Sequence, residues 1–322
     1  MARIHCTGTA ATALVVGEAL VDIVVGPDGA RTVHPGGSPL NVAVGLGRLG
    51  IETVLATRVG DDAFGSDIRS HLRDAGVTLG LQNYPADRTS SATATLRADG
   101  SAHYEFDVLW DVEQILADPV PVLHTGSIAA MLAPGADAVE ELLETAPVTT
   151  LLSFDPNIRP DLISSHAEAV DRTERLARYA HVVKMSDEDL HWLYPGVSSA
   201  EIATRYRELG VSLFVLTFGA KGCSLFSAGV EAALPAKPTT VLDTIGAGDA
   251  FMSGLLYGVI SSSSGTVLRE GRADRVLLEH LGRIAQRSAA LTVARRGAVP
   301  PTLLELHEET NPLNSDTPTI PA

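Results

Sequence analysis

DTIGAGDAF, residues 243–251, is a turn of small residues that leads into an apolar helix predicted over residues 246–260. Small residues at 246–248 let the backbone approach an anion closely, and the N–H groups that open a helix have no intrahelical acceptor. The helix dipole adds positive potential at the same point. Asp249, on the first turn, can take a proton from a hydroxyl that faces a bound phosphate. Alone, Asp249 would be an ordinary acidic residue at a helix start, so its context must decide.

PGGSPLNVAVGLGRLG, residues 35–50, is the second informative stretch. Pro39 suits the first turn of a helix that runs to Leu49 and stops at Gly50. Residues 45–50 also match the pattern GxGxxG, but a dinucleotide site needs that pattern after a strand and at a helix start. Here it closes a helix, which disfavours a dehydrogenase. Residues 219–222 lack the spacing of a P-loop.

Strands and helices alternate along most of the chain. We predict strands at 13–25, 52–60, 121–125, 148–154, 181–185 and 212–217, a hairpin-like pair at 222–234, and helices at 39–49, 64–75, 135–145, 167–178, 199–208, 246–260 and 273–294. This alternation predicts an α/β fold with a doubly wound, mainly parallel sheet flanked by helices.

A small β lid interrupts the alternation. Residues 90–108 alternate around Asp99-Gly100, a strong hairpin signal, and residues 22–36 belong to the same lid. Such an insertion cannot fold alone, so we predict a single domain over residues 1–308. Ser261–Ser264 with Gly265 reads as a short flexible loop, and the polar, proline-rich residues 309–322 as a flexible tail.

The composition excludes several classes of function. A net charge of −15 argues against nucleic acid or an anionic membrane as partner. The two cysteines form no CxxC pair, which favours a reducing, cytoplasmic location. The first twenty residues look a little like a signal peptide, but Glu18 and Asp22 interrupt the apolar stretch, so a first buried strand is the preferred reading.

Both quoted stretches resemble signatures of the ribokinase-like (PfkB) carbohydrate kinase family. DTIGAGDAFMSGL resembles the C-terminal signature and residues 35–50 the N-terminal one, in the family's order and about 200 residues apart. The resemblance spans residues 13–301, and GEALVD, VGDDAFG, DPNIRP and TFGAKG are similar to the fructokinase branch. It implies ATP-dependent phosphorylation of a sugar hydroxyl, with fructose to fructose 6-phosphate as the first expectation.

The resemblance also places roles on residues, with Asp249 as the general base. The further implied residues are an anion hole at Gly246, Ala247 and Gly248, a sugar site at Asp22, Gly36, Gly37, Asn41 and Arg159, and nucleotide contacts at Thr217, Gly219, Lys184 and Gly248. The residue types agree, because an acid at a strand end and an Asn at a helix start can bind several hydroxyls.

Alternatives stay open for some of these residues. Asn41 could be a helix cap, and Gly36 and Gly37 could serve only to form a turn. Arg159, in the loop after a predicted strand, could contact phosphate or order that loop. The adenine pocket is expected near residues 285–292 and 295–299.

The metal assignment rests on a departure from the family pattern. The family often carries Asn-x-x-Glu near its magnesium site, and the matching segment here is Ser186-Asp187-Glu188-Asp189. Mg²⁺ held through water tolerates the shorter acid at Asp189, and a solvated helix surface is the alternative. Some relatives bind a monovalent cation such as K⁺ near Asp243, which the sequence leaves open.

The acceptor and the assembly have alternatives too. Ribose or 2-keto-3-deoxygluconate could replace fructose, and Arg159 would suit the carboxylate of a sugar acid. A catalytically silent sugar sensor is the alternative from another class, and the intact Asp249 speaks against it. The lid's exposed edge invites pairing, so we expect a homodimer joined through the lid.

Overall fold

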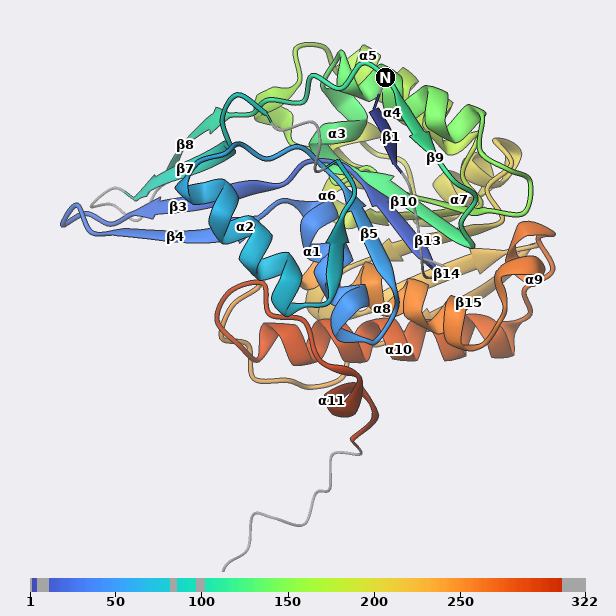
Figure 1. Ribbon diagram of the computed structural model, residues 1–322. Helices are drawn as coiled ribbons and strands as arrows, with labels where there is room; N and C mark the ends of the chain where they lie inside the picture. Colours follow the sequence, from blue (N-terminus) through green and yellow to red (C-terminus); the bar gives the residue numbers. More distant parts are fainter. Residues whose placement is uncertain (1, 5–11, 82–85, 97–101, 309–322) are drawn as a thin grey trace, which may run out of the picture.

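The computed structural model describes residues 2–4, 12–81, 86–96 and 102–308, and it shows a layered α/β molecule (Figure 1). A nine-stranded sheet forms the centre. Its strands, in spatial order, are β15 (Val230–Leu234), β14 (Cys223–Ser227), β13 (Leu213–Thr217), β12 (Val182–Ser186), β11 (Leu151–Asp155), β10 (Val122–Gly126), β2 (Ala13–Val16), β5 (Thr53–Ala56) and β6 (Val77–Leu79). All neighbours are parallel except the pairs of β14 with β13 and β15, which confirms the mainly parallel sheet.

Helices cover both faces of this sheet because both faces of its strands are apolar. One face packs against α1 (Ser38–Arg48), α8 (Ala247–Ser261) and α10 (Arg275–Val293). The other packs against α4 (Gly135–Glu144), α5 (His166–Ala177), α6 (Asp187–Leu193) and α7 (Ser199–Glu208). The carboxyl ends of the parallel strands meet at one edge, where ligands of such folds bind.

The lid is a separate four-stranded sheet in the order β4-β3-β7-β8. Its strands are β3 (Leu20–Val25), β4 (Arg31–Gly36), β7 (Ser90–Leu96) and β8 (Ala102–Asp107). Figure 1 shows it beside the central sheet, with α2 (Ala63–Asp74) close by. Both predicted lid segments are therefore confirmed, while the turn at Asp99-Gly100 lies outside the described residues.

The single strand predicted over residues 13–25 is wrong. The chain forms two strands in two different sheets, β2 in the central sheet and β3 in the lid, with a break at residues 17–19. Gly17 lies close against Pro39 and Ala129, where an added Cβ would come within 2.3 Å of the proline ring. The chain therefore leaves the central sheet at the point where it contacts Pro39 of α1. The hydropathy of single residues gives no information about such a contact between distant segments.

Several short elements were not predicted. They are β1 (Ala2–Ile4) paired with β9 (Ile115–Ala117), α3 (Ser127–Met131), α9 (Gly265–Arg269) and α11 (Leu303–His307), together with β6 and α6. The loop expected at 261–264 is shorter than predicted, because Ser261 is the last residue of α8 and Ser262 donates back to the Gly258 carbonyl at 2.6 Å. The predicted tail lies outside the described residues.

The GxGxxG stretch lies at the end of α1, as predicted, and its glycines serve packing. An added Cβ on Gly45 would come within 2.3 Å of the Ser253 hydroxyl on α8, and one on Gly47 within 2.3 Å of the Ala75 carbonyl. Gly50 follows the helix with a φ of +79°, which favours glycine. A dinucleotide site at this position is excluded by its place in the fold.

Candidate active site

Asp249 lies buried on the first turn of α8 and receives hydrogen bonds from two side chains of α1. The Ser38 hydroxyl donates to Asp249 Oδ1 at 2.6 Å, and Asn41 Nδ2 donates to Oδ2 at 2.8 Å. The helix-cap alternative for Asn41 is wrong, because the start of α1 has no side-chain cap bond. Both bonds use carboxylate lone pairs, which holds Asp249 in a fixed orientation at the sheet edge.

The predicted anion hole forms the start of α8. Gly246 precedes the helix in the left-handed conformation at φ +73°, and an added Cβ there would come within 2.6 Å of Ala298. The Ala247 N–H already donates to the Thr244 carbonyl at 3.2 Å. In the part of the chain that the structure describes, the N–H groups of Gly246 and Gly248 have no acceptor. These two groups can therefore donate to an anion.

A buried ion pair lies against the anion hole. Lys184 Nζ on β12 donates to Asp155 Oδ2 on β11 at 2.9 Å, and the two residues are 3% and 0% exposed. Nζ also lies 3.2 Å from the position that a Cβ on Gly248 would take. The ammonium group is thus placed where a phosphate held by α8 would reach it.

Burial and neighbouring charges shift the pKa values of both Lys184 and Asp155. Burial raises the pKa of Asp155 to about 6, although the Lys184 charge opposes the shift. Burial acts to lower the pKa of Lys184, but the charges of Asp155, Asp189 and Asp249 together raise it. These three carboxylates therefore favour the charged form of Lys184. Asp155 Oδ1 is buried without a hydrogen-bond partner among the described residues.

The predicted sugar residues lie where the lid meets α1. Asp22 occupies the space beside Gly36, since a Cβ on Gly36 would come within 2.1 Å of Asp22 Oδ2. Gly37 has a φ of +103°, and a Cβ on it would come within 2.8 Å of the Glu18 carbonyl. Gly37 is thus required by its backbone conformation and by close approach, whereas Gly36, the last residue of β4, leaves room for the Asp22 side chain. Burial raises the pKa of Asp22, Arg159 opposes this, and the charge of Asp249 adds to it.

Arg159 orders its own loop. Its Nη1 donates to the Asn157 side chain at 2.7 Å and to the carbonyls of Asn157 and Ile158. Asn157 has a φ of +38°, so this loop has an uncommon backbone that the arginine helps to hold. The side chain is exposed, and its charge lowers the pKa of Asp22, so Arg159 also lies near the sugar residues.

Asp189 is not on a solvated surface, and that alternative is wrong. It is 6% exposed, and its Oδ1 accepts from the Ile158 N–H at 2.8 Å. Its Oδ2 accepts from the N–H and the hydroxyl of Ser186, which completes a capping box at the start of α6. Among the described residues, no three His, Cys, Asp or Glu side chains gather as a metal site would require. This geometry ties α6 to the 156–158 loop.

The remaining predicted nucleotide residues lie at the same edge of the sheet. Thr217 is the last residue of β13, and Gly219 follows it with a φ of +52°. Asp243 accepts hydrogen bonds from the N–H groups of Ile245 and Gly297, which ties the loop before α8 to the loop after α10. Ala285 and Ser288 are fully buried in the contact of α10 with α8, so these two predicted adenine residues serve packing.

Glu18 is a buried acid that was not predicted to act in the site. It is 2% exposed, and its Oε2 accepts from the Ala129 N–H at the start of α3. Oε1 has no hydrogen-bond partner among the described residues. Burial raises the pKa of Glu18 to about 7. The side chain ties the segment between β2 and β3 to α3.

This pKa predicts a pH-dependent stability that Glu18→Gln removes. The acid is raised from an ordinary 4.5 to about 7, so its stabilising contribution is complete below pH 4.5 and is lost as the pH rises through 7. The loss is on the order of 3 kcal/mol. Urea unfolding should show Glu18→Gln more stable than the parent at pH 8 and not at pH 4.5. An equal difference at both pH values would contradict the assignment.

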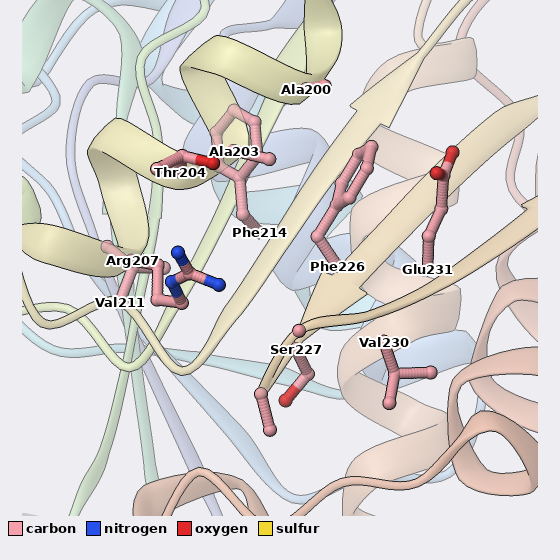
Figure 2. A pocket seen from close by; sticks show the side chains of 12 residues that line it. Ala200, Ala203, Thr204, Arg207, Val211, Phe214, Phe226, Ser227, Val230 and Glu231 are labelled. Atoms are coloured by element: carbon pink, nitrogen blue, oxygen red, sulfur yellow. The ribbon is translucent and has the colours of Figure 1, made fainter.

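A cavity of about 190 Å³ lies elsewhere, between α7 and the β14–β15 hairpin (Figure 2). Figure 2 shows Phe214 and Phe226 on one wall and Arg207 extending from α7. Phe214 lies near the amino end of β13, whereas Thr217 is at the carboxyl end of that strand. None of the predicted site residues lines this cavity.

Sequence reasoning missed Ser38 and Asp155 as site residues. Ser38 stands in the quoted GGSPLN stretch, directly before the helix that carries Asn41, and a hydroxyl there was a usable signal. Asp155 opens DPNIRP after a strand, but only the fold brings it to Lys184 on the next strand. No helix of the described ranges has both the length and the hydropathy to span a bilayer.

Comparison with known proteins identifies the family of this chain. The family model described as pfkB family carbohydrate kinase matches residues 10–303. Fructokinase-1 of Oryza sativa subsp. japonica is 32% identical over 312 residues, covering 90% of this chain and 94% of its own.

Solved structures agree with this match. The fructokinase of Xylella fastidiosa with bound ATP has a TM-score of 0.80 at 25% identity, covering 92% of this chain and 97% of its own. A double mutant of the Vibrio cholerae fructokinase, in a form with fructose, ADP and potassium ion bound, has a TM-score of 0.73 at 28% identity, covering 89% and 93%.

Proposed function

The chain belongs to the pfkB family of carbohydrate kinases, and we propose that it transfers the terminal phosphoryl group of ATP to fructose, giving fructose 6-phosphate. One observation carries the proposal. The buried Asp249 carboxylate, oriented by Ser38 and Asn41, lies on the same helical turn as N–H groups that have no acceptor among the described residues. The names and bound ligands of the fructokinases described above support the choice of fructose and ATP.

In the proposed reaction, Asp249 accepts the proton of the sugar hydroxyl as that oxygen attacks the terminal phosphorus. Ser38 and Asn41 keep the carboxylate aimed at the sugar. The bond between phosphorus and the bridging oxygen of ATP breaks, and ADP leaves. Charge on the transferring group is stabilised by the N–H groups of Gly246 and Gly248.

Lys184 supplies the fixed positive charge in this proposal. Its Nζ lies against Gly248, and Asp155 holds it there from the buried side. A cation at this place stabilises phosphate oxygens more strongly than in water, because the surroundings are buried. We assign Thr217 and Gly219 to the nucleotide and Asp22, Gly36, Gly37, Asn41 and Arg159 to the sugar.

We propose that Mg²⁺ enters with ATP. Mg²⁺ keeps several waters and binds phosphate oxygens, so it needs few protein ligands. Both oxygens of Asp189 already accept backbone N–H groups, so any role of this residue at the metal would be through water. The potassium ion of the Vibrio cholerae structure supports a test of K⁺ dependence.

A coupled assay that follows ADP release across a panel of sugars tests the proposal. Fructose should be the preferred acceptor over ribose and 2-keto-3-deoxygluconate, with activity requiring ATP and Mg²⁺. Preference for another sugar would show that fructose is not the acceptor, while the proposed sugar kinase activity would stand. No ADP release with any sugar would favour the alternative of a catalytically silent sugar sensor.

Replacing Asp22 by Ala should raise the KM for fructose about ten- to a hundredfold and leave the KM for ATP within about twofold. A hydrogen bond from a hydroxyl to a charged group contributes about 1.5–3 kcal/mol, and the lost contact is on the sugar side only. Steady-state kinetics with each substrate varied in turn measures both constants. Asp28→Ala, in the exposed turn between β3 and β4, is the control. An equal rise in both KM values would remove Asp22 from the sugar site.

We propose that the lid covers the sugar and joins two chains as a homodimer. β4 and β8 are the edges of the lid sheet, and a sheet edge pairs readily with another chain. A lid over the sugar would exclude water, which would otherwise compete for the phosphoryl group. Light scattering of the purified chain measures the assembly, and the mass of a single chain would contradict it. A cytoplasmic location stays a prediction.

A further inference from the structure

The pairing register of the lid sheet places His34 beside Asp22. Asp22 on β3 pairs with His34 on β4 and with Ala92 on β7, and Ala92 pairs with Phe106 on β8. Directly paired residues in a sheet extend their side chains to the same face. These four residues therefore form one row across one face of the lid.

This row is on the face that α2 does not cover. The alternate residues of β3, Val21 and Ile23, are buried in the same apolar cluster as Ile68 and Leu72 of α2. Asp22 extends from the opposite face, where the charges of Arg159 and Asp249 act on it. The row that contains His34 thus faces the predicted base.

On β4, His34 is the side chain of this face that lies nearest to Gly36 and Gly37, the predicted sugar residues at the end of the strand. Gly36, one step nearer on the same face, has no side chain, and Asp22 occupies the space beside it. Pro35 lies between them on the other face. His34 is exposed. Because His34 and Asp22 are directly paired across two neighbouring strands, their side chains lie close together.

We propose that His34 binds a hydroxyl of the sugar other than the one that is phosphorylated, and that it helps to select the acceptor. An ionised Asp22 can only accept hydrogen bonds, whereas an imidazole can donate one. Together they can hold two neighbouring hydroxyls, and Phe106 in the same row offers an apolar surface to the C–H groups. The inference rests on the proposed sugar kinase activity and adds a specificity residue to it.

The test compares His34→Ala and His34→Gln with a matched control on the same strand. Val33 lies one residue away on the opposite face and is 38% exposed, so Val33→Ala changes β4 without touching the row. His34→Ala should raise the KM for the sugar about tenfold, with kcat and the KM for ATP within about threefold. His34→Gln retains a donor and should show a smaller rise. Val33→Ala should stay within twofold.

Deoxy sugars separate a direct contact from a structural effect. If His34 binds one hydroxyl, one of 1-, 3- and 4-deoxyfructose should have the same raised KM with the parent enzyme as fructose has with His34→Ala. The KM for that deoxy sugar should not rise further in the variant. The proposal would be overturned if, for all three deoxy sugars, the variant raised the KM by the same factor as it does for fructose. It would also be overturned if the KM for fructose were unchanged in His34→Ala. If the parent enzyme prefers a sugar other than fructose, the deoxy forms of that sugar are used in the same comparison. The preference would then correct the proposed acceptor, and the comparison would still test the role of His34.

Discussion

Asp249→Asn should lower kcat about a hundred- to ten-thousandfold while ATP binding and the fold are retained. A positioned general base contributes a rate factor of this size, and an amide cannot take the proton of the attacking hydroxyl. The carboxylate accepts from Ser38 at Oδ1 and from Asn41 at Oδ2. An amide can accept only one of these two bonds, so a small loss of thermal stability, on the order of 1 kcal/mol, accompanies the kinetic effect.

Single-turnover rates, ATP titration and thermal unfolding separate these effects. Asp67→Asn on the exposed face of α2 is the matched control, because it makes the same chemical change away from the site. It should leave kcat within about twofold. If folded Asp249→Asn retained more than half of the parent turnover, the assignment of the base would be wrong.

Lys184→Met should destabilise the fold by about 3–5 kcal/mol and also lower turnover by about a hundredfold. Removing one partner of a buried ion pair leaves the other uncompensated, and Asp155 is fully buried with one oxygen already without a partner. The turnover loss has a different origin, because the ammonium lies against Gly248 of the anion hole.

The double variant Asp155→Asn with Lys184→Met separates the two roles. Removing both charges should recover most of the lost stability, while turnover stays low because no cation faces the phosphate. Urea unfolding and the coupled assay, applied to both single variants and the double variant, complete the cycle. Recovery of turnover together with stability would mean that Lys184 acts only through the fold.

Local patterns predicted most of the architecture and the chemical groups of the site. The helix at 199–208 has the predicted bounds, and α1, α8 and α10 begin and end within two residues of prediction. Signals close in sequence mark several of their ends, since Pro39 lies in the first turn of α1, Gly50 follows that helix, and the side chains of Ser198 and Asp274 cap α7 and α10. Asp249 drew attention because it follows the small residues of a predicted helix start, and the resemblance to carbohydrate kinases implied its role as the base. The lid hairpin followed from the alternation of residues 90–108 around Asp99-Gly100.

Only the tertiary structure decided which side chains meet. Ser38 and Asn41 reach Asp249 across more than 200 residues of sequence, and Asp155 reaches Lys184 from the neighbouring strand. The break between β2 and β3 depends on contact with Pro39 and Ala129, which no local pattern contains. Hydropathy and propensity describe a residue and its near neighbours, whereas burial, ion pairing and strand register are set by elements distant in the chain. The sequence therefore predicted the fold class and proposed Asp249 as the base, whereas packing determined how the side chains around Asp249 are oriented and charged.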